Sequence, residues 1–371
     1  MAQRLERAAE RVSSVELLFD LVFVFTITQV TEIVVAHPNV TGVAQAALTM
    51  AVVWWMYDAF AWLTNQSGEG AGLRIGLVSA MIAFLLLAVA IPEAFGASGI
   101  LFGFAYLAIV LIHFTLFAKF GAAGSARSML RVVPFNVAGA LLVVWAGFVT
   151  GPADWILFSL AILVMILTSF TVGPAGFDIG ASHFVERHGL LMIIAFGESI
   201  VSVGVGAGSH AFDLGILVGT VLCVGIVAAL WWCYFTGDDE RAGRSMTETP
   251  SRRRSYLALT AFGLDHFVMI FGLILLAAGV KLSIGNVFAV APPVAAILLG
   301  SGVALYLVGD ARYRQELELG PAALRYAGAA LAAASILLGL AVPVAWQLLV
   351  LLVIVVAVIA LEWKRDSQKS P

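Results

Sequence analysis

Residues 183–206 read HFVERHGLLMIIAFGESIVSVGVG and decide the fold class. The stretch is polar at its start, and its apolar remainder contains one charged residue, Glu198. At 1.5 Å per residue, Glu198 lies about 18 Å along a helix from Glu186. About 20 apolar residues cross a bilayer, where an ionised carboxylate costs several kcal/mol unless it is paired, solvated or protonated. The stretch is therefore predicted to be a transmembrane helix with a functional acidic residue.

The composition extends this interpretation to the whole chain. Of 371 residues, 61% are apolar and only 12% are charged, which is far outside the range of a soluble globular protein. The net charge is -3 and the basic stretches are short, so nucleic-acid binding is excluded. The predicted spans are 15–36, 41–63, 73–91, 99–120, 129–149, 154–172, 183–206, 214–236, 256–280, 287–308, 322–341 and 343–363. We expect an all-α polytopic membrane protein with about twelve transmembrane helices.

The distribution of basic residues predicts the orientation of these spans. With the N-terminus assigned to the cytoplasm, nineteen of the twenty Lys and Arg residues fall in inside connections or at inside helix ends. Only Lys281 falls outside. The run Arg252–Arg254 is interpreted as a topology anchor, with anionic-lipid contact as the lesser alternative. Both termini are therefore predicted to be cytoplasmic.

Four short motifs recur in the same order in the two halves of the chain. The matched pairs are WWxY at 54–57 and 231–234, LLAVAIPEAFG at 86–96 and LLAAGVKLSIG at 275–285, Leu-Arg at 130–131 and 324–325, and Trp155 and Trp346. Because six helices per half is an even number, the halves are predicted to be parallel six-helix repeats, residues 1–172 and 173–371. The polar stretch 237–255 falls within the second half and is predicted to be an inserted cytoplasmic loop.

Acidic residues in the first span are candidates for function. Ser13 and Glu16 fit a capping box, in which the Glu16 carboxylate bonds back to the helix cap. Asp20 lies on the same face beyond the first turn, where it needs a partner or water. The structural alternative for Asp20 is a buried ion pair that fixes helix packing. We expect Arg187 or His188 to offset the charge of Asp20 across the bundle.

The predicted span 183–206 carries the second group of candidate functional residues. Glu198 is expected to face an internal cavity, and Ser199 lies in a stripe of small residues along which another helix can approach closely. His183, Glu186 and His188 suggest a metal site, but helical ligands converge at a spacing of four residues, and these histidines are five apart. No metal or other cofactor is therefore expected.

Two further groups have both a structural and a functional interpretation. Asp265 and His266 stand together in an apolar span, either as a proton-carrying pair or as a helix–helix hydrogen bond. Trp54 and Tyr57 fit an interfacial aromatic belt. Asp58 follows Trp54 by four residues and so lies on the same helical face. Trp54 and Tyr57 therefore also fit an aromatic wall beside a carboxylate, on a path for a cation or substrate.

The strings ELLFDLVFVFTITQ (16–29) and HFVERHGLLMIIAFGESI (183–200) resemble the bacterial low temperature requirement A family. The likeness covers most of the chain, including both WWxY stretches. It implies a multi-pass protein of the bacterial cytoplasmic (inner) membrane, and it implies no particular substrate because the family is named after a growth phenotype. The positions suspected from the resemblance are Glu16, Phe19, Asp20, Glu186, Arg187, His188, Gly197, Glu198 and Ser199.

These features together favour a secondary transporter of an unknown small solute, coupled to a proton or another cation. In this hypothesis Glu198 or Asp20 exchanges the proton. A cation channel is the alternative, and a metal-dependent intramembrane enzyme is the third hypothesis. The expected partners are the lipid bilayer and the solute or ion, and a homo-oligomer is compatible with the sequence.

Overall fold

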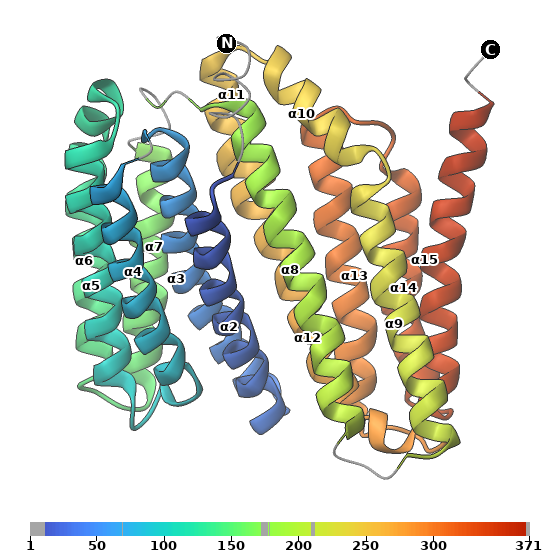
Figure 1. Ribbon diagram of the computed structural model, residues 1–371. Helices are drawn as coiled ribbons and strands as arrows, with labels where there is room; N and C mark the ends of the chain where they lie inside the picture. The colour runs from blue at the N-terminus through green and yellow to red at the C-terminus, as the bar shows by residue number, and fades with distance from the viewer. Residues whose placement is uncertain (1–11, 69, 172–176, 178, 209–211, 369–371) are drawn as a thin grey trace. The chain divides into compact units, whose positions relative to one another are not determined.

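The computed structural model describes residues 12–68, 70–171, 177, 179–208 and 212–368, and within them the regular structure is helical (Figure 1). The helices of the first half are α2 (Ser14–Ala36), α3 (Val40–Asn65), α4 (Ala71–Ala90), η1 (Ile91–Glu93), α5 (Gly99–Phe120), α6 (Ala123–Ala146) and α7 (Pro152–Thr171). The later helices are α8 (Ala181–Gly208), α9 (Leu214–Phe235), α10 (Asp238–Glu248), α11 (Ser251–Leu257), η2 (Ala258–Asp265), α12 (His266–Lys281), η3 (Ile284–Asn286), α13 (Pro293–Glu316), α14 (Ala323–Gly339) and α15 (Val344–Ser367). The predicted all-α class is confirmed.

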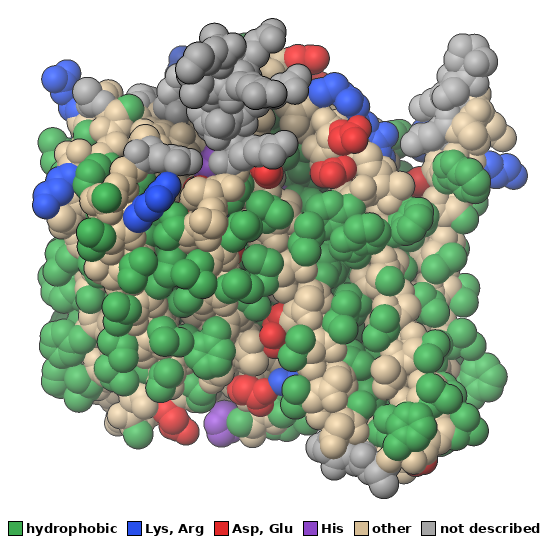
Figure 2. Space-filling model, in the orientation of Figure 1, with side chains coloured by type: hydrophobic (Ala, Val, Ile, Leu, Met, Phe, Trp, Pro, Cys, Tyr) green, Lys and Arg blue, Asp and Glu red, His purple; other side chains and the backbone are tan. Residues whose placement is uncertain are grey.

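Length and composition make this a polytopic membrane protein. In the described residues, eleven helical stretches are long and apolar enough to cross a bilayer, and α14 is a shorter apolar helix. With 17 residues, α14 is about 25 Å long, close to the hydrocarbon thickness of about 30 Å. Large apolar side chains are exposed on the helices, such as Ile75 (69%) and Val353 (57%). Figure 2 shows such side chains covering much of the middle of the visible helices, as lipid contact requires.

Glycine lets two of the helices approach each other closely. A Cβ on Gly302 of α13 would lie 2.6 Å from the backbone nitrogen of Leu276 on α12, and one on Gly272 would lie 2.7 Å from the carbonyl oxygen of Gly302. Only a hydrogen atom fits in this space. Small residues at such crossings allow the backbone contact that stabilises helix pairs in a membrane.

The chain divides into two compact units. The first comprises Met1–Ile33, Ala44–Leu191 and Met246–Leu259, and the second comprises Val34–Val43, Met192–Ser245 and Thr260–Pro371. In the first, α4 to α7 pack as consecutive neighbours, and in the second α12 to α15 do the same. The predicted boundary between the halves at 172 and 173 lies outside the described residues, and the repeat stays a prediction.

The stretch 237–255 differs from the expected loop because most of it is helical. Three acidic residues, Asp238 to Glu240, open α10, where the positive end of the helix dipole favours them. Pro250 separates α10 from α11. The Arg254 guanidinium donates to the carbonyl oxygens of Met246 (2.9 Å) and Ile179 (2.9 Å), among others. Arg254 therefore ties together the connecting segments before α8 and between α10 and α11, and the topology-anchor role of Arg252–Arg254 stays a prediction.

Candidate functional site

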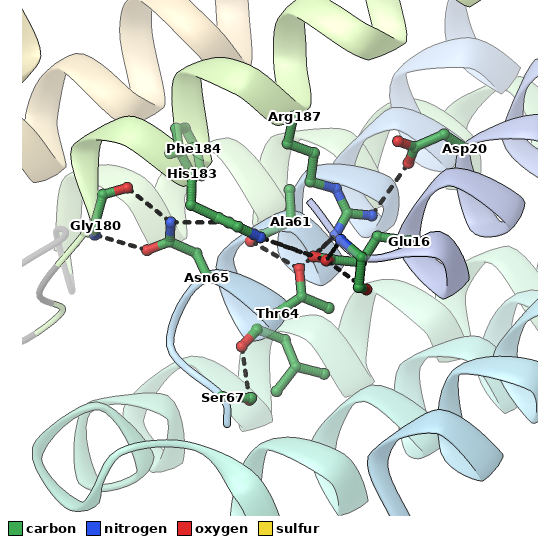
Figure 3. Close-up of polar contacts among 12 residues, drawn as sticks. Glu16, Asp20, Ala61, Thr64, Asn65, Ser67, Gly180, His183, Phe184 and Arg187 are labelled. Atoms are coloured by element: carbon green, nitrogen blue, oxygen red, sulfur yellow. Dashed lines mark hydrogen bonds and ion pairs between the residues drawn. The ribbon is translucent and has the colours of Figure 1, made fainter. Parts of the chain in front are cut away.

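Arg187 of α8 stands at the centre of a polar cluster inside the first unit (Figure 3). Its side chain is 1% exposed. Its Nη1 lies 2.8 Å from Glu16 Oε1 and its Nη2 lies 3.1 Å from Asp20 Oδ1. Nη1 also donates to the Thr64 hydroxyl. Of the two partners expected for Asp20, Arg187 and His188, the structure pairs it with Arg187, and Glu16 shares the same guanidinium.

Glu16 combines the predicted cap with an ion pair. Its Oε2 accepts hydrogen bonds from the backbone nitrogen and the hydroxyl of Ser13, at 2.9 and 2.8 Å. His183 Nε2 lies 3.3 Å from Oε1, the oxygen that also receives Arg187. Four donor groups on three residues therefore surround this carboxylate, as an ionised acid in a buried site requires.

Asp20 is less completely satisfied than Glu16. The Tyr57 hydroxyl donates to Asp20 Oδ1 at 2.9 Å, and Arg187 Nη2 reaches the same oxygen. Within the described residues, Asp20 Oδ2 has no hydrogen-bond partner, although the whole residue is buried. A buried carboxylate oxygen in this state costs about 1 to 3 kcal/mol or more when it is charged, and a proton on that oxygen removes the charge.

The backbone at Gly180 orients the Asn65 amide toward His183. The Gly180 nitrogen donates to Asn65 Oδ1 at 2.8 Å, and Asn65 Nδ2 donates to the Gly180 carbonyl at 2.9 Å. Asn65 Nδ2 is therefore also the donor toward His183 Nδ1, 3.4 Å away. With Nδ1 as acceptor, a neutral imidazole carries its hydrogen on Nε2, which points at Glu16.

The charges of this cluster do not balance. Glu16 and Asp20 face a single guanidinium, and His183 adds a positive charge only when it is protonated. One negative charge is in excess unless a proton or another cation is bound. Because Glu16 already receives Arg187, His183 and both donors of Ser13, the site open to that proton is Asp20 Oδ2.

Aromatic rings enclose the charged groups. The Arg187 guanidinium carbon lies 5.8 Å from the centre of the Phe19 ring and 5.9 Å from that of Tyr57, within the range of a cation–π interaction. Phe23 stacks on Tyr57 at 4.0 Å, and Trp54 packs against both rings. Trp54 is 6% exposed, so it is a core residue of this wall.

A polar cavity of about 590 Å³ adjoins the cluster within the first unit. Its lining residues include Glu16, Thr64 and His183, together with Arg74 and Arg254. Because Glu16 and Thr64 contact Arg187, and His183 contacts Glu16, the cavity adjoins the cluster. Water or a small polar solute that enters it meets the Glu16 carboxylate.

His188 and Asp58 form a second pair in the first unit. His188 Nε2 lies 3.5 Å from Asp58 Oδ1, and His188 Nδ1 bonds the Phe184 carbonyl oxygen at 2.9 Å. Glu186, in contrast, is exposed. His183 and His188 thus have different acidic neighbours, and the three residues of the suspected metal string do not converge.

The remaining predicted residues belong to the second unit. Glu198 is half-buried and accepts a hydrogen bond from Ser202 at 3.3 Å, while Ser199 donates to the carbonyl oxygen of Ala195 in its own helix. Neither residue is part of the Arg187 cluster. The role of Glu198 in proton exchange stays a prediction.

Asp265 and His266 have separate partners. Asp265 Oδ1 lies 2.8 Å from Nε of Arg312, a side chain that is 42% exposed. His266 Nε2 lies 2.9 Å from the Tyr234 hydroxyl, and its Nδ1 bonds the carbonyl oxygen of Ala261, five residues earlier in the π-helical segment η2. For His266 the helix–helix hydrogen bond is therefore present.

The sequence interpretation missed a second buried ionic cluster, in the second unit. Arg325 Nη1 lies 2.5 Å from Asp310 Oδ2, and its Nη2 lies 3.0 Å from Asp238 Oδ2. The remaining members are Glu362, which contacts Arg314 at 2.7 Å and Arg325 at 3.2 Å, and Arg241, which contacts Asp238. Three arginines thus meet three acids, so this cluster is balanced and suits a structural role.

The sequence interpretation also missed two members of the Arg187 cluster, Thr64 and Asn65. It did not predict the contact of His183 with Glu16 either. Thr64 and Asn65 lie at the end of α3, far from Arg187 in the chain. A hydroxyl and an amide at a helix end are common, and no spacing marked them. The five-residue separation of His183 and His188 was the one available signal, because it indicates different partners.

Comparison with known proteins gives the same assignment over nearly the whole chain. Residues 11–360 match the family model described as bacterial low temperature requirement A protein. An uncharacterized protein of Rhizobium meliloti is 28% identical over 312 residues, which cover 79% of this chain and 75% of the relative. The matched range includes Glu16 and Asp20 on α2, Arg187 on α8 and most of both compact units. The chain therefore belongs to the bacterial low temperature requirement A protein family.

Proposed function

We propose that this protein is a secondary transporter of the bacterial cytoplasmic membrane, which couples movement of a small solute to a proton or another cation. The observation that carries the proposal is the charge excess of the Arg187 cluster. Two buried carboxylates share one guanidinium beside a polar cavity. A buried site that lacks one positive charge must hold a mobile cation or a proton.

Asp20 is the residue that binds and releases the proton. In one state the proton sits on Oδ2 and the cluster is neutral. In the other state the proton has left, and a cation that enters from the cavity supplies the missing charge. Because both ligands neutralise the same excess, binding of one favours departure of the other, which is the requirement for coupled exchange.

The proposed orientation and repeat fit this mechanism. We assign both termini to the cytoplasm and divide the chain into two parallel six-helix halves, residues 1–172 and 173–371, which contain α2 and α8 respectively. The basic residues of the connections support this orientation through the positive-inside rule. Alternating access then requires the site on α2 and α8 to open to each side in turn.

The test uses the full chain reconstituted in vesicles with a trapped pH-sensitive dye. A proton gradient is imposed, and a panel of small amines, amino acids, sugars and inorganic cations is added to one side. Solute-dependent, saturable proton movement is expected for the wild type. Asp20→Asn is expected to abolish the coupled proton movement, because the amide cannot release the proton. Equal coupled flux in wild type and Asp20→Asn would remove Asp20 from the mechanism.

Two controls separate the alternatives. Glu93→Gln changes an exposed acid to an amide outside the cluster and is expected to keep coupled flux. Glu198→Gln tests whether the acid of the second unit contributes as well. Non-saturable current that needs no solute would indicate a cation channel instead.

A further inference from the structure

The polar cavity of the first unit carries more positive than negative charge on its lining. Among the described residues that line it, Glu16 is the one acid, whereas Arg74 and Arg254 contribute two guanidinium groups. The Glu16 carboxylate is already paired with Arg187, whose Nη1 lies 2.8 Å from it. The charge that remains to attract a solute into the cavity is therefore positive.

Arg254 is half-buried, and its partners among the described residues are all uncharged. Its Nε and Nη1 donate to the carbonyl oxygens of Met246 and Ile179, each at 2.9 Å. Its Nη2 donates to the carbonyl oxygens of Thr247 at 3.3 Å and Thr249 at 3.0 Å. Four of the five N–H groups of the guanidinium are thus used. One N–H on Nη1 and the whole positive charge remain for a ligand.

The Arg254 guanidinium is held beside the start of α8. Ile179, whose carbonyl oxygen it reaches, directly precedes Gly180, and Gly180, Ala181 and Ser182 line the cavity. The first N–H groups of this 28-residue helix have no acceptor within the helix, and they form the positive end of its dipole. The helix end therefore reinforces the positive potential that Arg254 creates.

The other lining residues and the volume narrow the class of anion. Asn65, Ser67 and Thr247 are among the polar residues of the lining, so the cavity suits a hydrophilic solute. Its volume of about 590 Å³ corresponds to about 20 water molecules at about 30 Å³ each. The cavity is therefore large enough for an organic anion, whereas an inorganic ion would leave most of it to water.

We propose that this cavity binds a small hydrophilic organic acid through its carboxylate, with Arg254 and Arg74 as the residues that attract the anion. This inference rests on the proposed transport function and names the class of its solute. A guanidinium group donates charge-assisted hydrogen bonds to a carboxylate, which are about twice as strong as those between neutral groups. Two guanidinium groups on one lining favour an acid with two carboxylates.

The charge of the Arg187 cluster links the anion to the coupling ion. When Asp20 carries a proton, Glu16 and Arg187 cancel and the cluster beside the cavity is neutral. A protonated His183 or another cation neutralises the cluster in the same way. Without any of these the cluster is negative and repels the anion. The anion therefore binds best when the positive charge is present, which couples the solute to the proton or cation.

The test is calorimetric titration of the purified full-length protein in an uncharged detergent at fixed ionic strength. Three probes share a four-carbon chain: succinate is an anion, succinamide is uncharged and 1,4-diaminobutane is a cation. Succinate is expected to bind with a Kd of about 0.1 to 10 mM, as befits a ligand of this size. Succinamide should bind about tenfold more weakly because it lacks the charge, and the diamine should not bind.

Two substitutions of Arg254 separate its charge from its role in folding. Arg254→Gln removes the charge and is expected to weaken succinate binding about tenfold. Arg254→Lys also loses the four carbonyl contacts, but it keeps the charge and is expected to bind succinate more tightly than Arg254→Gln. Equal succinate affinity of these two variants would show that the charge of Arg254 does not attract the anion.

A second arginine and a matched control complete the set of variants. Arg74→Gln changes an exposed side chain of the lining and is expected to weaken succinate binding severalfold without loss of folding. Arg252→Gln changes an exposed arginine that is not among the lining residues and is expected to bind as wild type. Wild-type affinity in both Arg74→Gln and Arg254→Gln, or binding of the diamine as tight as that of succinate, would overturn the anion site.

The outcomes distinguish this site from the transport function and from a lipid site. Asp20→Asn keeps the cluster neutral and is expected to bind succinate at least as tightly as wild type; weaker binding would refute the link to the cluster. Succinate binding without flux of any solute in vesicles would leave the site standing and refute the transporter. Proton-coupled flux of another solute, without succinate binding, would refute the site alone. Displacement of succinate by phosphatidylglycerol added to the micelles would assign the cavity to a lipid headgroup and overturn the solute site.

Discussion

Replacing Asp20 by Asn and Arg187 by Gln in separate variants tests the charge count on which the Arg187 cluster depends. If Asp20 is protonated, Asn is a close neutral substitute for it. The Asn Oδ1 can keep the hydrogen bonds from Tyr57 and Arg187 that Asp20 Oδ1 accepts at 2.9 and 3.1 Å. If Asp20 is instead ionised and a second cation balances it, the same change deletes a buried charge and leaves that cation without its counter-charge.

The two substitutions are expected to lower the free energy of unfolding by amounts that differ severalfold. Asp20→Asn should cost less than about 1 kcal/mol, because no charge is lost and both donors keep an acceptor. Arg187→Gln removes the guanidinium from Glu16, Asp20 and Thr64 and leaves a buried carboxylate without its cation, for about 3 to 5 kcal/mol. The ratio of the two losses in unfolding free energy therefore indicates whether Asp20 is protonated.

The assay is thermal unfolding of each purified variant in the same detergent. At about 2 °C per kcal/mol, Arg187→Gln should lower the midpoint by about 6 to 10 °C and Asp20→Asn by less than about 2 °C. In infrared difference spectra, the carbonyl band of a protonated carboxylic acid should be present in the wild type and lost in Asp20→Asn. A midpoint that falls as far in Asp20→Asn as in Arg187→Gln would show that Asp20 is ionised and refute the charge count.

Three further predictions concern the scaffold. Arg325→Gln leaves Asp310 and its acidic neighbours unbalanced and should cost about 3 to 5 kcal/mol in thermal unfolding, whereas the exposed Arg365→Gln should change little. Gly302→Ala should cost about 1 to 3 kcal/mol, since its Cβ would press on the α12 backbone; a midpoint like that of wild type would contradict the close helix contact. Arg254→Ala removes hydrogen bonds to the carbonyl oxygens of connecting segments, so limited proteolysis should cut residues 237–250 faster than in an Arg252→Ala control.

The sequence by itself determined the membrane class, nearly all of the helix positions and the family. Twenty-residue apolar windows are set by bilayer thickness, which is a local property of the chain. The same reasoning gave Arg187 or His188 as the partner of Asp20, because a charge at membrane depth requires an opposite charge at similar depth, and the structure pairs Asp20 with Arg187. It failed for the stretch 237–255, whose polar composition indicates exposure to water but does not distinguish a loop from a surface helix.

Only the tertiary structure decided which polar groups meet and in what ratio. Glu16 could be identified as a cap, but its contacts with Arg187 and His183 join residues more than 160 positions apart in the chain. The balanced cluster around Arg325 and the polar cavity at Arg254 likewise depend on helices that no periodicity relates. Local sequence fixes what a helix can bury, whereas the packing of several helices fixes whether the buried charges cancel.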